Sequence, residues 1–452
     1  MRGDEEVLPE TVAGAEVRAD RDGPRRWYVL GVMLLVYAIN IADRYVVSTV
    51  LEPIRLELHL SDAAVGLLTG AALALFYVTV SLPVSALADR GNRRNIVAVS
   101  LLLWSAMTVA CGFVRNFWQL LVARIGVGVG ESGATPASTA LIGDRFRPAE
   151  RPMAMTVFTL GAPLGAWLGS DLAGRVADAH GWRGAFLALG APGLVLGLVV
   201  FLTVREPRRA ALDPEAPAQA ESIPLRRTLA RIWRNRAVMH LMAAGALSAL
   251  WGWGLIWWAP AYFVRAFGLT VGQVGASLGA AHLVAGAGVT LLASWAMGLR
   301  VFRASRNILW TLAALTAIST VPSILMLFAR TPVGALAMIW AFLPAIYFYI
   351  GPSIGLLQNW VPPAMRAQTT AISVLMGNVT NLVVAPVAVG VLSDAFAGVS
   401  GASASSLRWA MAVLALTGFW AAWHYWAAAR ALRTDGTPGD GGRPSVDRDA
   451  AQ

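Results

Sequence analysis

Lysine is absent from this 452-residue sequence, cysteine occurs once, and charged residues make up only 14% of the chain. A phosphate-binding loop of the Gly-x-x-x-x-Gly-Lys-Ser/Thr type needs a lysine, so the sequence excludes ATP-driven pumping by that machinery. The single cysteine, Cys111, excludes a disulfide framework and a cysteine-based metal cluster. No Ser-His-Asp constellation or metal-ligand spacing stands out, so we predict no enzymatic activity, no cofactor and no bound metal.

Hydrophobic residues are in excess. They make up 57% of the chain, whereas an average soluble domain has about 45–50%. Apolar stretches of about 20 residues, the length that crosses a bilayer core, occur repeatedly. Twelve such stretches cover residues 27–51, 62–87, 95–114, 117–142, 152–173, 184–204, 237–264, 272–298, 306–328, 332–357, 367–392 and 406–429. We therefore predict an all-α membrane protein with twelve transmembrane helices.

The arginines behind the formal net charge of +10 are distributed between the connections as expected for such a membrane protein. With a cytoplasmic N-terminus, eighteen arginines fall in the cytoplasmic connections and seven in the outer ones. By the positive-inside rule, both termini are cytoplasmic, and the basic charge does not indicate a nucleic-acid partner. The first 25 residues lack an apolar core segment, so we expect no cleavable signal peptide.

The longest internal connection divides the spans six and six. We predict an N-terminal tail, a first six-helix bundle, a cytoplasmic central loop, a second six-helix bundle and a C-terminal tail. Their bounds are 1–26, 27–204, 205–236, 237–429 and 430–452. The tetrapeptides 148-PAER-151 and 363-PAMR-366 precede the fifth and eleventh spans and lie 215 residues apart, as a duplicated unit would place them.

One part of the central loop has an amphipathic pattern. In 222-SIPLRRTLARIWRNR-236, apolar residues at helical spacing alternate with arginines. Such a segment suits a surface helix lying on anionic lipid, and a solvated linker turn explains it equally well.

The end of the second span carries a motif, 85-SALADRGNRR-94. It resembles the loop signature of the major facilitator superfamily, Gly-x-x-x-Asp-Arg-x-Gly-Arg-Arg, although Ser85 replaces the first glycine and the second moves to Gly91. The resemblance implies a conformational lock formed by Asp89, Arg90, Arg93 and Asp144. In it Asp89 contacts the start of the eleventh helix, and Arg90 reaches Asp144 at the end of the fourth. Anchoring by positive charge alone is the alternative.

Four segments together are more specific. The segments 40-NIADRYVVSTVL-51, 85-SALADRGNRRN-95, 104-WSAMT-108 and 124-RIGVGVGESGATP-136 look like the spinster branch of that superfamily, and the chain is similar to a bacterial member of it. The resemblance covers the N-terminal half well and the C-terminal half loosely. It implies alternating-access transport of lysosphingolipid or lysophospholipid cargo.

Charged residues lie inside two of the predicted spans of the first half. Arg124 and Glu131 share one helix face at i and i+7, and Asp43 and Arg44 are adjacent in the first span. From the helical rise, Asp43 and Arg124 lie about 10–12 Å below the outer surface and Glu131 about 21 Å. We therefore expect an ion pair between Asp43 and Arg124, with Glu131 deeper and less obviously paired.

These charges suggest a proton-coupled site. We predict that Asp43 and Glu131 carry protons, because a buried carboxylate without a close cation favours its neutral form. The guanidinium groups suit a phosphate or carboxylate of the substrate. The predicted substrate-binding residues are Asn40, Arg44, Arg124, Trp251, Trp258, Asn378 and Asn381. A static polar network that fixes helix packing is the alternative.

The leading hypothesis is a proton-coupled secondary transporter of an amphiphilic, anionic, lipid-like substrate. A proton symporter of a small organic anion is the alternative within transport, and a non-transporting sensor or scaffold is the alternative from another class. We expect a monomer among membrane lipids of the bacterial inner membrane, with protons and the substrate as its other partners.

Overall fold

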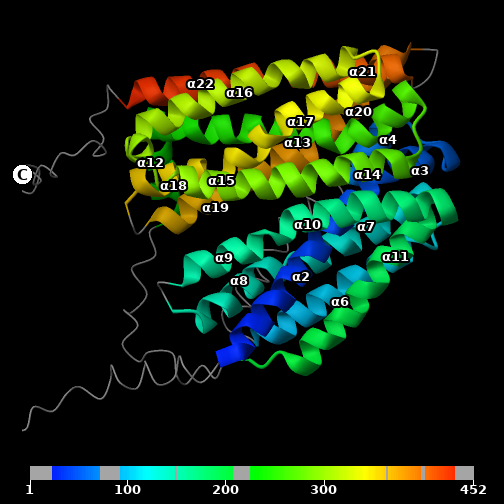
Figure 1. The fold of residues 1–452 in the computed structure, drawn as a ribbon, viewed down its shortest axis with the longest axis horizontal. Helices are drawn as coiled ribbons and strands as arrows, with labels where there is room; N and C mark the ends of the chain where they lie inside the picture. Colours follow the sequence, from blue (N-terminus) through cyan, green and yellow to red (C-terminus); the bar gives the residue numbers. More distant parts are fainter. Residues whose placement is uncertain are drawn as a thin grey trace, which may run out of the picture.

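The computed structural model describes residues 23–71, 92–147, 150–206, 224–362, 365–398 and 403–432. Regular structure in these ranges is helical, without strands. The helices form two groups, which lie mainly in the lower and upper parts of Figure 1, with residues 51–66 of the first group reaching up beside the second. The first group comes from residues 23–203 and the second from residues 225–431. This arrangement confirms the all-helical, two-bundle prediction.

The helices of the first group follow the predicted spans closely. Its elements are α2 Gly23–Thr49, α3 Leu51–Glu57, α4 Asp62–Gly66, η2 Leu67–Ala71, α6 Arg93–Cys111, α7 Phe117–Glu131, α8 Ala134–Arg145, α9 Arg151–Thr159, α10 Gly161–Trp167, η3 Leu168–Leu172 and α11 Ala173–Thr203. Those of the second group are α12 Leu225–Arg234, α13 Arg236–Phe267, α14 Val271–Ala281, η5 His282–Gly286, α15 Ala287–Ala296, η6 Arg300–Arg303, α16 Ser305–Phe328, α17 Pro332–Phe348, α18 Ile350–Trp360, α19 Arg366–Asn378, η8 Val379–Val384, α20 Ala385–Ala397, α21 Ala404–Ala415 and α22 Thr417–Ala431.

Eight helical runs of the described chain are long and apolar enough to cross a membrane. Several predicted spans are divided or merged in the structure. The span 117–142 is broken after Glu131 into α7 and α8, and the last span is broken at Leu416 into α21 and α22. The fifth and sixth spans form one run of 51 residues, in which Gly181 adopts a φ of 74° that suits only glycine at a sharp turn. Most of the second span lies outside the described residues.

Within the described ranges, four π-helical turns mark equivalent places in the two halves. They are η2, η3, η5 and η8, and they fall in the second, fifth, eighth and eleventh predicted spans. Elements of these spans also make the contacts between the halves, where α4 packs on α20 and α14 packs on η3 and α11. π-turns locally widen a helix and often occur at functional sites, and here they lie in the spans that form the contacts between the two bundles.

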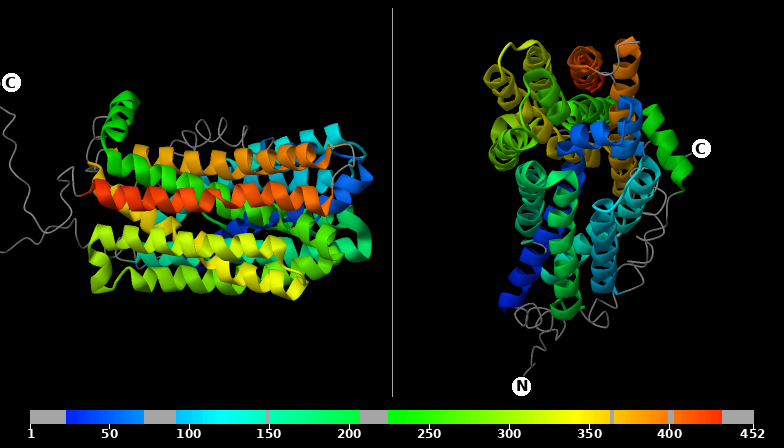
Figure 2. Two further views of the ribbon diagram at one scale, coloured as in Figure 1. Left: turned by 90° about the horizontal axis from the view of Figure 1, so that it is seen from above. Right: turned by 90° about the vertical axis from the view of Figure 1, so that its right-hand side faces the viewer.

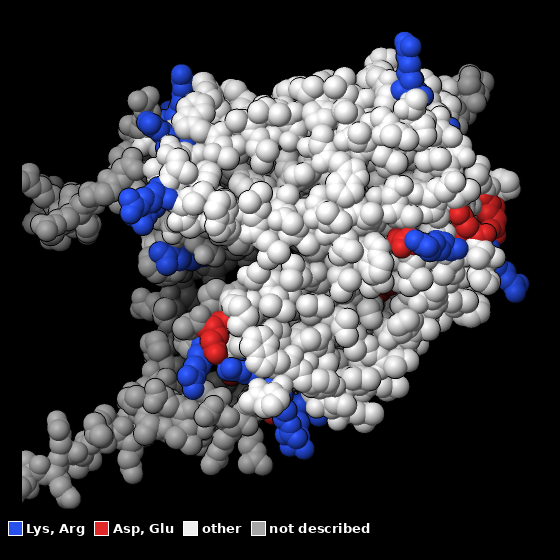
Figure 3. Space-filling view, in the orientation of Figure 1, with Lys and Arg blue, Asp and Glu red and all other residues white. Residues whose placement is uncertain are grey.

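The two ends of the bundle differ. We call the end at which α2 begins and α22 finishes the termini end, and the opposite end, which carries α3 and α4, the far end (Figure 1). At the far end the halves approach closely, because a Cβ atom added at Gly275 would lie 2.2 Å from the Ser170 carbonyl oxygen, and one at Gly390 would lie 2.3 Å from that of Asp62. At the termini end, Figure 3 shows a hollow between the two halves.

Candidate functional site

A buried ion pair lies at the centre of the first half. Glu131, the last residue of α7, is fully buried, and its Oε2 accepts hydrogen bonds from Arg44 Nε at 2.9 Å and Nη2 at 2.7 Å. Arg44 projects from α2, and its side chain keeps 16% of its surface exposed. The other carboxylate oxygen of Glu131 is buried and has no hydrogen-bond partner. The pair therefore leaves a buried acceptor unused.

The predicted ion pair between Asp43 and Arg124 is wrong. Both side chains are buried, but neither carboxylate oxygen of Asp43 has a hydrogen-bond partner, and Arg124 Nη1 donates to the Asp43 backbone carbonyl at 3.5 Å. Glu131, which we expected to be less obviously paired, is the partner of Arg44. Neighbouring residues on a helix point about 100° apart, so similar depth did not decide which of Asp43 and Arg44 faces α7.

The Asp43 carboxylate lies against α6. Thr108 and Trp104 approach it as side-chain donors without reaching hydrogen-bond geometry, and Glu131 and Arg124 interact with it through their charges. The Trp104 indole nitrogen and the Thr108 hydroxyl are themselves buried without a hydrogen bond. The segment 104-WSAMT-108 entered the sequence-based prediction only as part of a resemblance, and both contacts were missed. The available signal was the i, i+4 spacing of two hydrogen-bonding side chains inside an apolar span.

Asn40 lies one turn before the charged pair on α2. It is buried, and its amide nitrogen has no hydrogen-bond partner. It lies beside Tyr37, Phe158 and Ser138, with no space among them for a water molecule, and the Ser138 hydroxyl is also unpaired. Two buried side chains with unpaired polar atoms therefore lie next to each other, Asn40 one turn from the charged pair on α2 and Ser138 on the neighbouring α8.

The second half faces α2 with aromatic side chains. Tyr45, next to Arg44 on α2, has its ring centroid 5.0 Å from that of Trp257 and 4.9 Å from that of His282. Trp257 Nε1 donates to Asn381 Oδ1 at 2.7 Å, and His282 Nδ1 lies 2.9 Å from the Tyr347 hydroxyl. We call Tyr45, Trp257, His282, Tyr347 and Asn381 the aromatic wall. It joins the halves beside the central charges.

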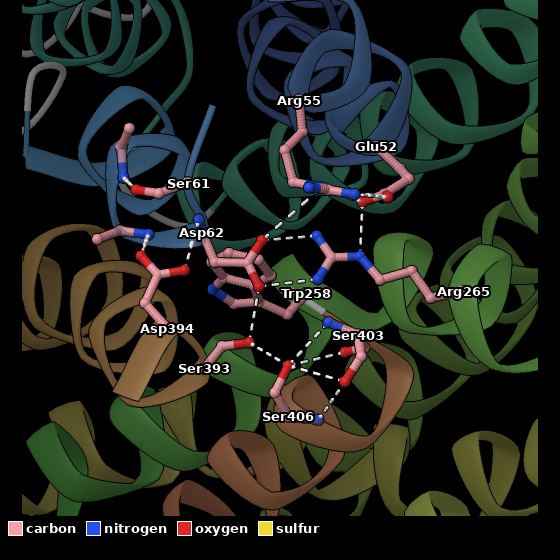
Figure 4. Close-up of polar contacts among 12 residues, drawn as sticks. Glu52, Arg55, Ser61, Asp62, Trp258, Arg265, Ser393, Asp394, Ser403 and Ser406 are labelled. Atoms are coloured by element: carbon pink, nitrogen blue, oxygen red, sulfur yellow. Dashed lines mark hydrogen bonds and ion pairs between the residues drawn. The ribbon is translucent and has the colours of Figure 1, made fainter. Parts of the chain in front are cut away.

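The other predicted residues of the second half lie elsewhere. Trp251 is buried between helices, and its indole nitrogen donates to Ser323 Oγ at 2.9 Å. Trp258 donates to the Pro386 carbonyl at 3.3 Å and lies beside the polar network at the far end (Figure 4). Asn378 is partly buried on α19. A substrate-binding role for Trp251 and Trp258 stays a prediction that their placement does not support, because Trp257 is the tryptophan that faces α2.

Part of the predicted conformational lock is described. Arg93 forms an ion pair with Asp144, although the resemblance implied Arg90 as the partner. Asp89 and Arg90 lie outside the described residues. Glu206, which the sequence-based prediction did not single out, accepts hydrogen bonds from the backbone nitrogens of Arg93 at 3.1 Å and Arg94 at 2.8 Å. A carboxylate at a helix N-terminus is stabilising, so Glu206 fixes the start of α6.

A second charged cluster closes the far end. Arg265 at the end of α13 donates to both oxygens of Asp62 at 2.7 and 2.8 Å and to Glu52 Oε2 at 2.6 Å. Arg55 donates to Glu52 at 2.7 Å, and Ser393 donates to Asp62 at 2.6 Å. We call these five residues the far-end network (Figure 4). Because Arg265 and Ser393 belong to the second half, the network ties the two halves together.

Two aspartates extend this closure in a symmetric way. Asp394 on α20 accepts hydrogen bonds from the backbone nitrogens of Asp62 at 3.0 Å and Ala63 at 2.9 Å, at the start of α4 (Figure 4). Asp178 on α11 accepts from Thr270 Oγ1 at 2.6 Å and the Gly272 nitrogen at 3.0 Å, at the start of α14. The two aspartates lie 216 residues apart, close to the 215-residue offset of the sequence repeat. Each carboxylate fixes a helix N-terminus of the other half.

Outside the membrane spans, one carboxylate has a shifted acidity. Glu57 lies at the end of α3, where Arg183 Nη1 donates to it at 2.5 Å and Trp182 Nε1 at 2.7 Å. These hydrogen bonds lower the pKa of Glu57. Among the residues that the structure describes, no group of three or more His, Cys, Asp or Glu side chains is placed to hold a metal ion.

Comparison with known proteins agrees with the fold. The family model of the Major Facilitator Superfamily matches residues 33–384. An MFS-type efflux pump of Mycolicibacterium smegmatis is 32% identical over 423 residues, which cover 92% of this chain and 96% of that protein. The sphingosine-1-phosphate transporter SPNS2 of Danio rerio is 32% identical over 241 residues, which cover 52% of this chain and 47% of that protein. The match therefore covers about half the length of this spinster relative.

A solved structure is similar along nearly the whole chain. It is the crystal structure of a bacterial homologue of the human lysosomal transporter spinster, in an inward-facing and unoccupied conformation. The TM-score is 0.80 and the sequences are 27% identical, with 91% of this chain and 98% of that chain covered. The spinster-like resemblance found in the N-terminal motifs is thereby confirmed for the fold as a whole.

Proposed function

Because the chain belongs to the major facilitator superfamily, we propose that it is a proton-coupled transporter that moves an amphiphilic, anionic, lipid-like substrate by alternating access. The observation that carries this proposal is the Asp43 carboxylate, which is buried without a hydrogen-bond partner. It lies beside Arg124 and the Arg44–Glu131 pair. Burying a charge without partners is costly, so Asp43 is a group that gains stability by taking up a proton.

The two ends of the bundle support alternating access. The far-end network ties the halves together, whereas the surface is hollowed between them at the termini end. From the arginine distribution we propose that the termini end faces the cytoplasm of a bacterial cell. The bundles 27–204 and 237–429 then rock about the central site. In the opposite state the far-end contacts separate and the lock around Asp89 and Arg90 forms the closure.

Arg44 is the residue we propose for the anionic group of the substrate. Its guanidinium already binds a carboxylate through two nitrogens, and a phosphate or carboxylate of the substrate offers the same geometry. Arg124 supplies a second, more deeply buried positive charge. The aromatic wall begins at Tyr45, the residue after Arg44, and continues into the second half, where its rings suit the apolar part of an amphiphile.

Proton uptake follows from competition for Arg44. When the substrate anion takes this guanidinium, Glu131 is left buried without its cation and gains stability by binding a proton. Release of the substrate restores the pair and frees the proton. Asp43 interacts with Glu131 through like charge, so this second carboxylate favours the uptake of one proton by the two acids. Substrate and proton therefore occupy the site together.

A small organic anion is the second candidate substrate. It is favoured by the enclosure of both central arginines, since Arg124 is only 1% exposed and the Arg44 side chain 16%. In that case the aromatic wall serves as packing between the halves. Direct competition between lysolipids and small carboxylates for transport distinguishes the two substrates.

The test is substrate-dependent proton flux in proteoliposomes under an imposed pH gradient. Lysolipids and organic anions are added to wild type, Asp43→Asn and Glu131→Gln, with Glu57→Gln as the matched control because Glu57 is a carboxylate far from the site. We expect flux in wild type and in the control, and at least a tenfold loss in the two site variants. Transport that is equal in all four proteins and independent of the gradient would contradict proton coupling.

A further inference from the structure

Helix α12 lies across the bundle rather than along it. It occupies the termini end, and the view from above shows it standing out sideways from the bundle (Figure 2, left). Its ten residues, Leu225–Arg234, belong to the amphipathic segment of the central loop. If the bundle spans a membrane, a helix in this place runs along the membrane surface and projects over lipid. The transport site does not use it.

Two residues hold α12 against the second half. Thr228 and Ile232 are buried, and the Thr228 hydroxyl donates to the Gln368 side chain on α19. Leu225, Leu229 and Trp233 repeat at every fourth position and stay 55%, 37% and 70% exposed. At 100° per residue this stripe borders the docked face. A helix that only needed to pack on the protein would not present a tryptophan and two leucines outward.

The remaining face of α12 is basic. Arg226, Arg227, Arg231 and Arg234 are all exposed. Among the described residues, none of the four forms an ion pair within 4.0 Å. Exposed positive charge beside an exposed apolar stripe is the pattern of a helix that inserts one face among acyl chains and meets phosphate groups with the other.

We propose that α12 is a binding surface for anionic phospholipid of the membrane in which the chain sits. The stripe of Leu225, Leu229 and Trp233 enters the boundary between head groups and acyl chains. The four arginines contact lipid phosphates. Each guanidinium adds electrostatic attraction to the negatively charged membrane surface. The charge of the helix selects anionic over zwitterionic lipid, because the apolar stripe alone does not distinguish them.

A site-specific fluorescent probe tests this surface in the full chain. The only cysteine, Cys111, is buried, so a Cys111→Ala background carries Leu225→Cys labelled with a polarity-sensitive dye, which leaves Leu229 and Trp233 in place. Ala230→Cys, exposed on the basic side, is the matched control. Both are reconstituted in phosphatidylcholine vesicles with and without phosphatidylglycerol, and quenching by nitroxide-labelled lipid is measured.

We expect the Leu225 probe to be quenched at least about twofold more in phosphatidylglycerol vesicles than in pure phosphatidylcholine, and this gain to fall with added salt. The Ala230 probe should show less quenching throughout. Replacing the four arginines of α12 by glutamine should abolish the gain, whereas Arg300→Gln, Arg303→Gln and Arg306→Gln, at the same end of the bundle, should keep it.

Two results would overturn the proposal. Equal quenching of the Leu225 probe in both vesicle types would mean that α12 contacts lipid without distinguishing anionic from zwitterionic head groups. Quenching no greater than that of the Ala230 probe assigns it to a solvated linker. The salt dependence is measured on the helix with all its arginines, so the conclusion does not rest on the folding of the fourfold variant.

Discussion

The chain holds two clusters of buried charge that are satisfied to different degrees. In the far-end network, Asp62 accepts hydrogen bonds from Arg265 and Ser393, and Glu52 from Arg55 and Arg265. In the central cluster, both oxygens of Asp43, one oxygen of Glu131 and the Arg124 Nε have no partner. Buried polar groups in folded proteins are nearly always paired, so the central cluster is the exception that calls for a function.

The difference separates a structural role from a reactive one. A network in which each carboxylate has its donors holds one arrangement of the halves, because breaking any of its hydrogen bonds leaves a buried charge unpaired. A cluster with unused acceptors gains free energy when a proton or an anion arrives. The far-end network therefore defines the closed end, and the central cluster is where ligands change the state.

Loss of Arg265 should have the largest effect. Arg265→Gln removes the buried cation that binds both Glu52 and Asp62. Arg55 remains as the cation beside them, and breaking a buried pair costs about 3–5 kcal/mol. We expect a lower melting temperature of the purified protein and faster labelling of a cysteine introduced at Ser48, a buried residue that donates to the Trp257 carbonyl of the other half. Arg330→Gln, exposed and in the α16–α17 connection, is the control. An unchanged melting temperature of the Arg265→Gln variant would show that Arg55 alone neutralises Glu52 and Asp62.

Close packing at the far end should give a smaller effect. Gly275→Leu places side-chain atoms where the Ser170 carbonyl lies, and overpacking of this kind costs about 1–3 kcal/mol. The population with the far end open should rise, measured as longer distances between spin labels at Phe113 and Val333. Gly351→Leu has open space around its Cβ and should leave the distances unchanged. The same distances in both variants would mean that the halves do not separate there.

Asp43 and Asp62, which are both fully buried, should respond in different ways to neutralisation. Asp43→Asn removes a charge that has no hydrogen-bond partner. The free energy of unfolding should therefore change by no more than about 1 kcal/mol, and the melting temperature should stay the same or rise. Asp62→Asn removes the acceptor of Arg265 and should lower it. Equal destabilisation by both substitutions, measured by thermal unfolding in detergent, would show that Asp43 has a structural partner.

The smallest effect is expected at the surface. The folded pKa of Glu57 is lowered by Arg183 and Trp182, so its contribution to stability is present above the unfolded pKa and is lost as pH falls through the folded value. The difference in melting temperature between wild type and Glu57→Gln should therefore be small at neutral pH and disappear in acid, once the pH is below the lowered pKa of Glu57. A difference that persists in acid would indicate packing rather than charge.

Local sequence predicted the helices better than their ends. The apolar runs gave the positions of the spans because about 20 apolar residues have no other stable place than a bilayer or a large core. The break after Glu131 was missed, since 124-RIGVGVGESGATP-136 reads as one continuous helical run. The turn at Gly181 had a visible signal, a glycine between two apolar runs.

The sequence predicted which charged residues lie together at the candidate site, but the predicted ion pair between them was wrong. Asp43, Arg44, Arg124 and Glu131 do lie together, because rare charges in apolar helices must gather to be neutralised. Their partners depend on how α2 and α7 are rotated about their own axes, which the packing of α6 and the second half decides. The aromatic wall was missed for the same reason, as Trp257 and not Trp251 or Trp258 faces Tyr45.

Sequence by itself determined that this chain is a twelve-span membrane protein of duplicated design with ionisable groups at its centre. These properties depend on hydrophobicity, charge and repeat spacing, which are local or additive. Only the tertiary structure decided that Arg265 meets Asp62 across 203 positions of sequence, and that Arg44 rather than Arg124 binds a carboxylate. Such contacts depend on the relative rotation and tilt of packed helices, to which residues from the whole chain contribute.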